Sequence, residues 1–161
     1  GVGRGVDHLE DVVGEAAAQL VKSHRGALVA GLLAECRDVV DSLAPGTRVT
    51  VHASSDPWST GSFAYVGGPG ALEGVDVVVA LGWSDLLRDR RLADLRALAG
   101  STTLGVYLRL DRGWPGEFLD EALEHLRLAG VEELHLYHTG LWPASHWRVA
   151  EQLTAARGEL S

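Results

Sequence analysis

Apolar and polar residues alternate strictly between Leu104 and Asp111, where the chain reads Leu-Gly-Val-Tyr-Leu-Arg-Leu-Asp. Successive side chains of a strand point to opposite faces of its sheet. The leucines and Val106 therefore share one face, and Tyr107, Arg109 and Asp111 share the other. In a parallel sheet covered by helices on both sides, both faces of a strand are apolar. This pattern instead indicates helices on one side and a lined pocket on the other, as in the wall of a barrel.

The remaining chain is predicted to alternate between helices and strands. Helical spacing of apolar residues and terminal signals predict helices at Asp7–Leu20, Leu28–Leu43, Ser84–Ala99, Gly116–Ala129 and Ala144–Arg157, with a kink or break at Ser23–Gly26. Strands are predicted at Thr47–Ala53, Val75–Leu81, Thr102–Leu110 and Glu132–Tyr137, with a long loop at 54–74. This order predicts one α/β domain over residues 1–161 with parallel strands.

Three of the four predicted strands place polar or aromatic groups on one face: His52 in the first, Tyr107 in the third, and His135 with Tyr137 in the fourth. A (β/α)8 barrel lines its interior with one face of each strand and keeps its sites at the strands' C-terminal ends. Four strands make half of such a barrel. A flavodoxin-like open sheet is the alternative. The chain contains no methionine, which fits a fragment or C-terminal portion of a larger barrel.

The fourth strand also carries a family resemblance. Residues 130–141, Gly-Val-Glu-Glu-Leu-His-Leu-Tyr-His-Thr-Gly-Leu, followed by Pro143–Trp147, resemble the end of the last strand in bacterial glycoside-hydrolase-like TIM-barrel proteins. The resemblance covers about 20 residues, and the rest of the chain matches only as a strand–helix pattern. It implies a carbohydrate-like ligand. The usual carboxylate pair of that family is not identifiable here, so the resemblance does not establish hydrolysis.

The composition of the chain disfavours several classes of binding partner. The 22 acidic and 14 basic residues give a net charge of −8, which disfavours nucleic acid and anionic membranes as partners. No apolar run reaches the ~20 residues that span a bilayer. A single cysteine excludes an intramolecular disulfide and CxxC motifs. The glycines at 67–70 lack the spacing of phosphate-binding loops, so we expect no cofactor.

Aspartates follow three of the strands, and paired carboxylates are what glycoside hydrolysis requires. We predict Asp111 and Asp56 as catalytic groups and Asp85 as a substrate-binding group. Structural roles are the alternatives for each residue. Asp56 before Pro57 fits a turn, Asp85 fits a helix cap, and Asp111 fits an ion pair with a neighbouring arginine.

Further ligand contacts are predicted near the same strand ends, at Arg109, Tyr107, Tyr137, His138, His52, Trp58 and Trp83. An arginine facing inward needs a carboxylate, a phosphate or a polar ligand, since an unpaired buried charge is very costly. Flat aromatic faces pack against sugar rings or cations. An internal salt bridge for Arg109, gap-filling roles for the tryptophans and hydrogen-bonding core roles for the histidines are the alternatives. No spacing typical of a metal site is present, and none is predicted.

Two functional hypotheses follow. The first is an enzyme-like, glycoside-hydrolase-like barrel segment that binds a small polar or carbohydrate ligand, with the loop at 54–74 covering the pocket. The second is a non-catalytic binding or assembly domain. In both, the open edges of four strands are predicted to pack against another half-barrel polypeptide or a second copy in a homodimer.

Overall fold

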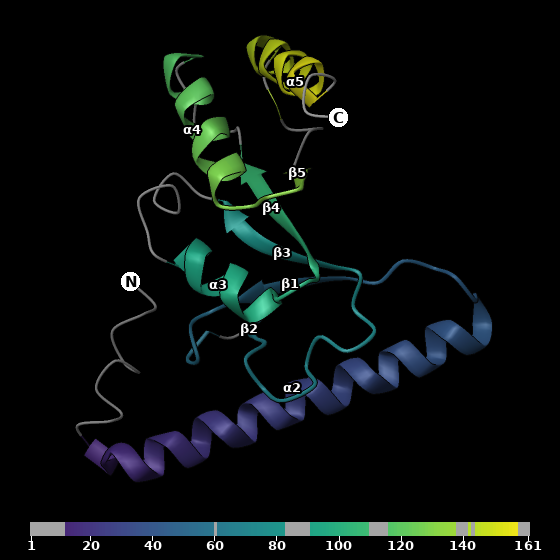
Figure 1. The fold of residues 1–161 in the computed structure, drawn as a ribbon, viewed down its shortest axis with the longest axis vertical. Helices are drawn as coiled ribbons and strands as arrows, with labels where there is room; N and C mark the ends of the chain where they lie inside the picture. Colours follow the sequence, from purple (N-terminus) through teal and green to yellow (C-terminus); the bar gives the residue numbers. More distant parts are fainter. Residues whose placement is uncertain are drawn as a thin grey trace.

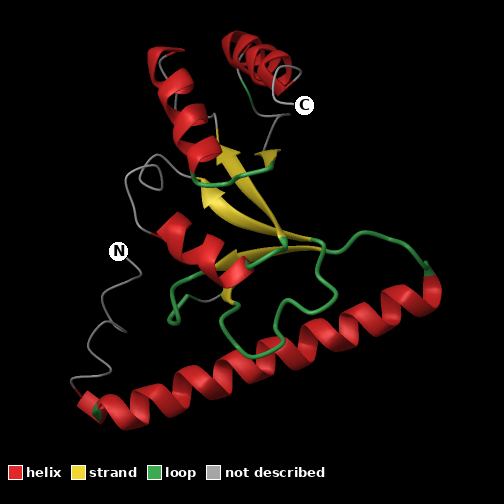
Figure 2. Cartoon of the chain, viewed as in Figure 1, coloured by secondary structure: helices red, strands yellow, loops and turns green. Residues whose placement is uncertain are grey.

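The computed structural model describes residues 12–59, 61–82, 91–109, 116–137, 142 and 144–157. Its elements are α2 (Glu15–Leu43), β1 (Thr50–Ser54), β2 (Ala64–Tyr65), β3 (Val77–Gly82), α3 (Arg91–Ala99), β4 (Thr103–Arg109), α4 (Gly116–Leu128), β5 (Glu133–Tyr137) and α5 (Ala144–Arg157). Figures 1 and 2 show the strands between α2 at one end of the molecule and α4 and α5 towards the other.

The strands form one sheet in the order β2-β1-β3-β4-β5, and every neighbouring pair is parallel. The predicted parallel α/β architecture is thus confirmed. Helices connect β3 to β4 and β4 to β5. The connection from β1 to β3 carries the two-residue strand β2, where only a loop is predicted from the sequence. This strand is too short to show any alternation of apolar and polar positions.

One face of the sheet forms the main core, and we call it the helix face. The strand register places Val78, Leu104 and Val106 on this face, and none of them is measurably exposed. They cluster with buried residues of three helices, Leu92 and Leu95 of α3, Leu126 of α4 and Ala150 of α5. Val29 and Ala30 of α2 pack against the same cluster. All four described helices therefore contribute to the core on one side of the sheet.

The helix α2 is continuous from Glu15 to Leu43, so the predicted kink or break at Ser23–Gly26 is wrong. No proline interrupts this stretch, and a single glycine is tolerated within a helix. Gly26 is buried instead, because the loop crosses it there. A Cβ at Gly26 would lie 2.9 Å from the Cα of Gly68. The glycine thus permits close approach of two backbones.

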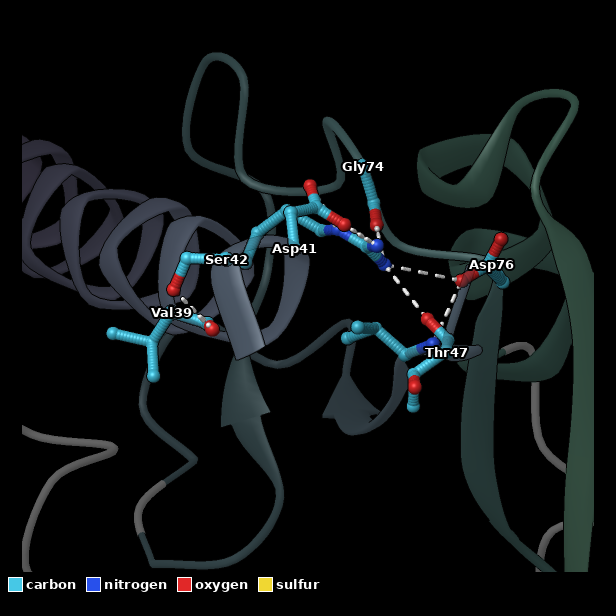
Figure 3. A network of polar contacts seen from close by, with 8 residues as sticks. Val39, Asp41, Ser42, Thr47, Gly74 and Asp76 are labelled. Carbon is cyan, nitrogen blue, oxygen red and sulfur yellow. Dashed lines mark hydrogen bonds and ion pairs between the residues drawn. The ribbon is translucent and has the colours of Figure 1, made fainter. Parts of the chain in front are cut away.

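Hydrogen bonds and ion pairs of Arg37 connect the C-terminal end of α2 to the segments that lead into the sheet. Its guanidinium pairs with Asp41 one turn later and donates to the carbonyl oxygens of Thr47 (3.2 Å) and Gly74 (3.4 Å). Asp76 lies 3.5 Å from the same guanidinium and accepts the backbone N–H of Val49. Figure 3 shows these groups converging where the chain enters β1 and β3. The network sets where both strands begin relative to α2.

Two further predictions concern the helices. The helix predicted from Asp7 is described from Glu15 onwards, and residues 1–11 lie outside the described part of the chain. The helix predicted from Ser84 is described from Arg91, with residues 83–90 likewise outside. Within the described residues, no helix is long and apolar enough to cross a membrane.

Candidate functional site

The opposite face of the sheet, which we call the polar face, gathers most of the chemistry that the structure describes. Strand register and alternation place on it Thr50 and His52 of β1, Val77 and Val79 of β3, Thr103, Gly105 and Tyr107 of β4, and Glu133, His135 and Tyr137 of β5. The predicted grouping of His52, Tyr107, His135 and Tyr137 on one face is confirmed. The second strand adds Val77 and Val79 to that face.

Side chains from the two ends of the sheet meet over this face. Arg48, two residues before β1, pairs with Glu133 at the start of β5, although β3 and β4 lie between them. In a flat sheet, three strand spacings would separate β1 from β5 by roughly 14 Å. Two long side chains therefore span the space over β3 and β4 on the polar face.

Glu133 holds a histidine in place. Its Oε2 lies 3.3 Å from Nε2 of His135 on the same strand. Burial alone would raise the pKa of Glu133, but the hydrogen bonds and charges of Arg48 and His135 lower it overall. The imidazole of His135 leans over Gly105, where a Cβ would lie only 3.0 Å from Nε2. The missing side chain at Gly105 thus makes room for the ring.

Aromatic rings continue the site from one side of the sheet to the other. His52 stacks on Phe63 with ring centroids 4.9 Å apart and planes 6° from parallel. Tyr107 meets the edge of His52 at 5.8 Å and lies 4.4 Å from Tyr137. Tyr107 is only 6% exposed, whereas Tyr137 is 42% exposed. The row thus runs from a buried centre to an accessible end on β5.

The surroundings of His52 change the pKa of its imidazole. Burial, and secondarily the nearby His135, lower the pKa of its imidazole. His52 is therefore neutral at pH 7 and can donate or accept a hydrogen bond.

The centre of the polar face is buried, although no described helix residue covers it. Val77 and Val79 are completely buried and cluster with Tyr107, and this cluster contains no described helix residue. We attribute the burial of the valines to the long side chains that meet over β3 and β4. The partly exposed polar groups of this face therefore surround an apolar floor.

The predicted site residues divide into three sets. His52, Tyr107 and Tyr137 come together in the aromatic row. Asp56 and Trp58 lie elsewhere: Oδ1 of Asp56 accepts the backbone N–H of Trp58 at 2.9 Å, which is a turn contact. The side chain of Arg109 and all of Trp83, Asp85, Asp111 and His138 lie outside the residues whose placement is described.

Trp58 packs against α2. Nζ of Lys22 lies 5.2 Å from the centroid of its ring, and Cζ of Arg25 lies 5.8 Å away. Arg25 also donates to the carbonyl oxygen of Ser59 at 2.7 Å. These cation–π and hydrogen-bond contacts connect the segment after β1 to α2.

Four residues of the site were not predicted as such. The alternation in β5 places Glu133 on the face of His135, so this pair could have been found from the sequence. Arg48 and Phe63 carry no comparable signal, because their contacts depend on the order of the strands in the sheet and the path of the loop. Among the described residues, no three His, Cys, Asp or Glu side chains are placed to hold a metal ion.

Comparisons of the chain with models of known protein families, with curated proteins and with solved structures found no match.

Proposed function

We propose that this chain forms half of a (β/α)8 barrel and that its polar face is one wall of a ligand pocket. The observation that carries the proposal is the division of the sheet into two unlike faces. Every described helix contributes to the core on the helix face, whereas the polar face bears histidines, tyrosines and Glu133. A flavodoxin-like sheet has helices on both faces. The ion pair between Arg48 and Glu133 further supports barrel-like curvature.

The ligand that best suits this face is a small carbohydrate-like molecule. Tyr137 offers an accessible ring beside Tyr107, and such rings pack against the apolar faces of sugars. His52 and His135 supply hydrogen bonds for hydroxyl groups. Tyr107 and Tyr137 lie towards the C-terminal ends of their strands, where barrels keep their sites. The resemblance of residues 130–147 to glycoside-hydrolase-like barrels agrees with this ligand class.

For hydrolysis we propose Asp111 as one of the two carboxyl groups, because the alternation of residues 104–111 in the sequence predicts it on the face of Tyr107. The turn contact of Asp56 makes it the weaker candidate for the second. Glu133 faces the same wall, but its lowered pKa makes it a poor general acid and a weak general base, so it suits a positioning group. Its contact with His135 favours the positioning role.

A non-catalytic assembly domain is the second candidate. It is favoured by apolar side chains exposed along α2, among them Leu28 (60%), Leu32 (61%) and Val39 (55%). Single exposed apolar residues are ordinary, but a row of them on one helix marks an interaction surface. This candidate predicts assembly without saccharide binding.

Saccharide binding separates the two candidates. Saturation-transfer NMR with a panel of mono- and disaccharides should detect binding, and Tyr137→Ala should weaken the affinity for any bound sugar about tenfold, or ~1.4 kcal/mol. Trp147→Ala is the control, because Trp147 is a half-exposed aromatic residue on α5. Hydrolysis of nitrophenyl glycosides, abolished by Asp111→Asn, would support an enzyme. No binding by any sugar would favour the assembly domain.

A further inference from the structure

Helix α2 exposes more large apolar side chains than the other described helices do. Within the described residues, α3, α4 and α5 each expose one, namely Leu98, Leu128 and Trp147. Six are exposed on α2, and four of these form a row with exposed fractions between 41% and 61%: Val21, Leu28, Leu32 and Val39. Figure 1 shows α2 along one edge of the molecule, with the sheet and the other helices on one side of it. The row is therefore accessible to another molecule.

The spacing of the row is symmetric. An α-helix turns by about 100° per residue, so the four side chains lie within a stripe about 40° wide. They are separated by seven, four and seven positions, and the row therefore has the same spacing from either end of the helix. Its midpoint is position 30. A row of this kind matches a second copy of itself when the second helix runs in the opposite direction.

Polar groups beside the row complement each other in the same arrangement. His24 and Glu35 are both exposed and lie on one flank of the row, about 40–60° from its centre. They are placed almost symmetrically about position 30. In an antiparallel pair with a two-fold axis, equal flanks of the two helices face each other, so His24 of each copy lies beside Glu35 of the other. An imidazole N–H can donate a hydrogen bond to a carboxylate, and this contact is made twice.

We propose that two copies of this chain associate through α2 in antiparallel orientation, with row against row. Leu28 of each copy packs against Leu32 of the other at the centre, and Val21 packs against Val39 towards the ends. A parallel pair would leave His24 and Glu35 about 16 Å apart along the helix. The inference rests on the assembly function considered above, for which it names the partner, and it does not require a ligand pocket on the polar face.

The size of the row predicts a weak, reversible dimer. From Val21 to Val39 the helix rises about 27 Å and is about 10 Å wide, so the strip covers on the order of 300 Å² on each copy. A standard stable interface buries about 800 Å² on each partner. The monomer and the dimer should therefore exchange, and the dimer should form as the concentration rises.

Sedimentation velocity of the 161-residue chain over a range of concentrations measures this equilibrium. The mass should rise from 17.1 kDa towards twice that value. Leu28→Asp should weaken the dimer at least about tenfold, because it places a charge in the centre of the contact twice. Leu20→Asp is the matched control and should leave the dimer unchanged. Leu20 is 73% exposed on the same helix but lies about 100° around it from the centre of the row.

Charge reversal tests the orientation. His24→Glu should weaken the dimer about threefold or more, because each introduced carboxylate meets Glu35 of the other copy. Adding Glu35→Lys to His24→Glu should restore the dimer, since the two positions then carry opposite charges. This rescue is specific to the antiparallel pair. Circular dichroism melts confirm that each variant is folded.

The single cysteine gives an independent measure of the orientation. In the antiparallel pair the two copies of Cys36 are offset by about 18 Å along the helices, whereas a disulfide requires Cα atoms about 4.4–6.8 Å apart. Oxidation should therefore form no disulfide within the dimer. Rapid formation of a disulfide-linked dimer would indicate a parallel pair and overturn the proposal.

Three further results would also overturn it. One is a monomer at every accessible concentration, which would assign the row to a different partner. Another is a dimer that Leu28→Asp leaves intact. The third is a failure of Glu35→Lys to rescue His24→Glu. The saccharide titrations are repeated on Leu28→Asp, so that the two proposals are judged separately. Saccharide binding without a dimer would retain the proposed pocket alone, and a dimer without saccharide binding would retain the association alone.

Discussion

Arg48 and Glu133 form an ion pair across the polar face, although they are 85 positions apart in the chain and two strands of the sheet lie between them. Glu133 is 20% exposed in its side chain and Arg48 is 54% exposed. The pair connects the start of β1 to the start of β5 and lies on the side of the sheet that has no described helix layer. It thus links two strands of the face on which the register places His52, His135 and Tyr107.

Replacing Arg48 by methionine should destabilise the fold more than removal of an ordinary surface pair does. Methionine keeps apolar volume but leaves Glu133 without its cation. An exposed pair contributes about 0–1 kcal/mol. We expect a loss at the upper end of that range, about 1 kcal/mol, because the carboxylate is partly buried. Urea unfolding measures the difference.

Arg127→Met is the matched control. Arg127 pairs with Glu124 on the surface of α4 at 2.7 Å, and both side chains are more than half exposed. Removing that pair should cost less than removing the Arg48 pair, because water screens both of its charges. Equal effects of the two substitutions would mean that the Arg48 pair stabilises the fold no more than a surface pair does.

Two glycines of α2 should respond to alanine in opposite directions. Gly31 has nothing within 4 Å of a new Cβ, so Gly31→Ala should stabilise the helix by about 0.5–1 kcal/mol. At Gly26 the new Cβ would meet the backbone of Gly68 at 2.9 Å, so Gly26→Ala should destabilise by about 1–3 kcal/mol. Thermal melts of the two single variants compare them directly. A stabilising Gly26→Ala would show that the loop does not cross the helix there.

The strands were largely predictable, because alternation is a local property. The strand predicted at Thr102–Leu110 is β4 at Thr103–Arg109, and its apolar side chains at 104, 106 and 108 enter the main core. The role of Gly26 was not predictable, since its partner Gly68 lies 42 positions away. From the local sequence, a glycine within a helix predicts a destabilised helix. Only the path of the loop shows that Gly26 contacts another segment.

The candidate site was predicted in part for the same reason. His52, Tyr107 and Tyr137 follow from alternation and register. Arg48 reaches Glu133 across two intervening strands, and no pattern within a single strand's sequence indicates such a contact. Trp58 follows a strand end, where the ligand-binding residues of a barrel lie, but its ring contacts Lys22 and Arg25 of α2.

Alanine at Gly105 should displace His135. Its Cβ would lie 3.0 Å from Nε2 of His135 and 3.2 Å from a methyl carbon of Val79. The imidazole must shift, which weakens its 3.3 Å contact with Glu133. We expect a net cost of about 1 kcal/mol, because alanine also reduces the entropy of the unfolded chain. Chemical shifts of the His135 ring nitrogens report the displacement. Unchanged shifts would contradict the tight fit.

His52 should make the fold less stable in mild acid. Burial, and then the charge of His135, lower its pKa in the folded chain below the ordinary 6.5. Well above pH 6.5 the imidazole is neutral in both the folded and the unfolded chain. There the lowered pKa does not change the free energy of unfolding. As the pH falls below 6.5, the unfolded chain takes up the proton first, and the free energy of unfolding decreases until the pH passes the folded pKa.

Titration of the His52 ring proton by NMR, with urea unfolding between pH 5 and 8, measures both effects. His52→Phe keeps an aromatic ring against Phe63 and should reduce the dependence, whereas His24→Phe on the exposed side of α2 should leave it. His135→Asn should raise the pKa of His52 only in part, since burial is the larger cause. A His52 pKa at or above 6.5 would place the ring in open solvent and remove it from the proposed pocket wall.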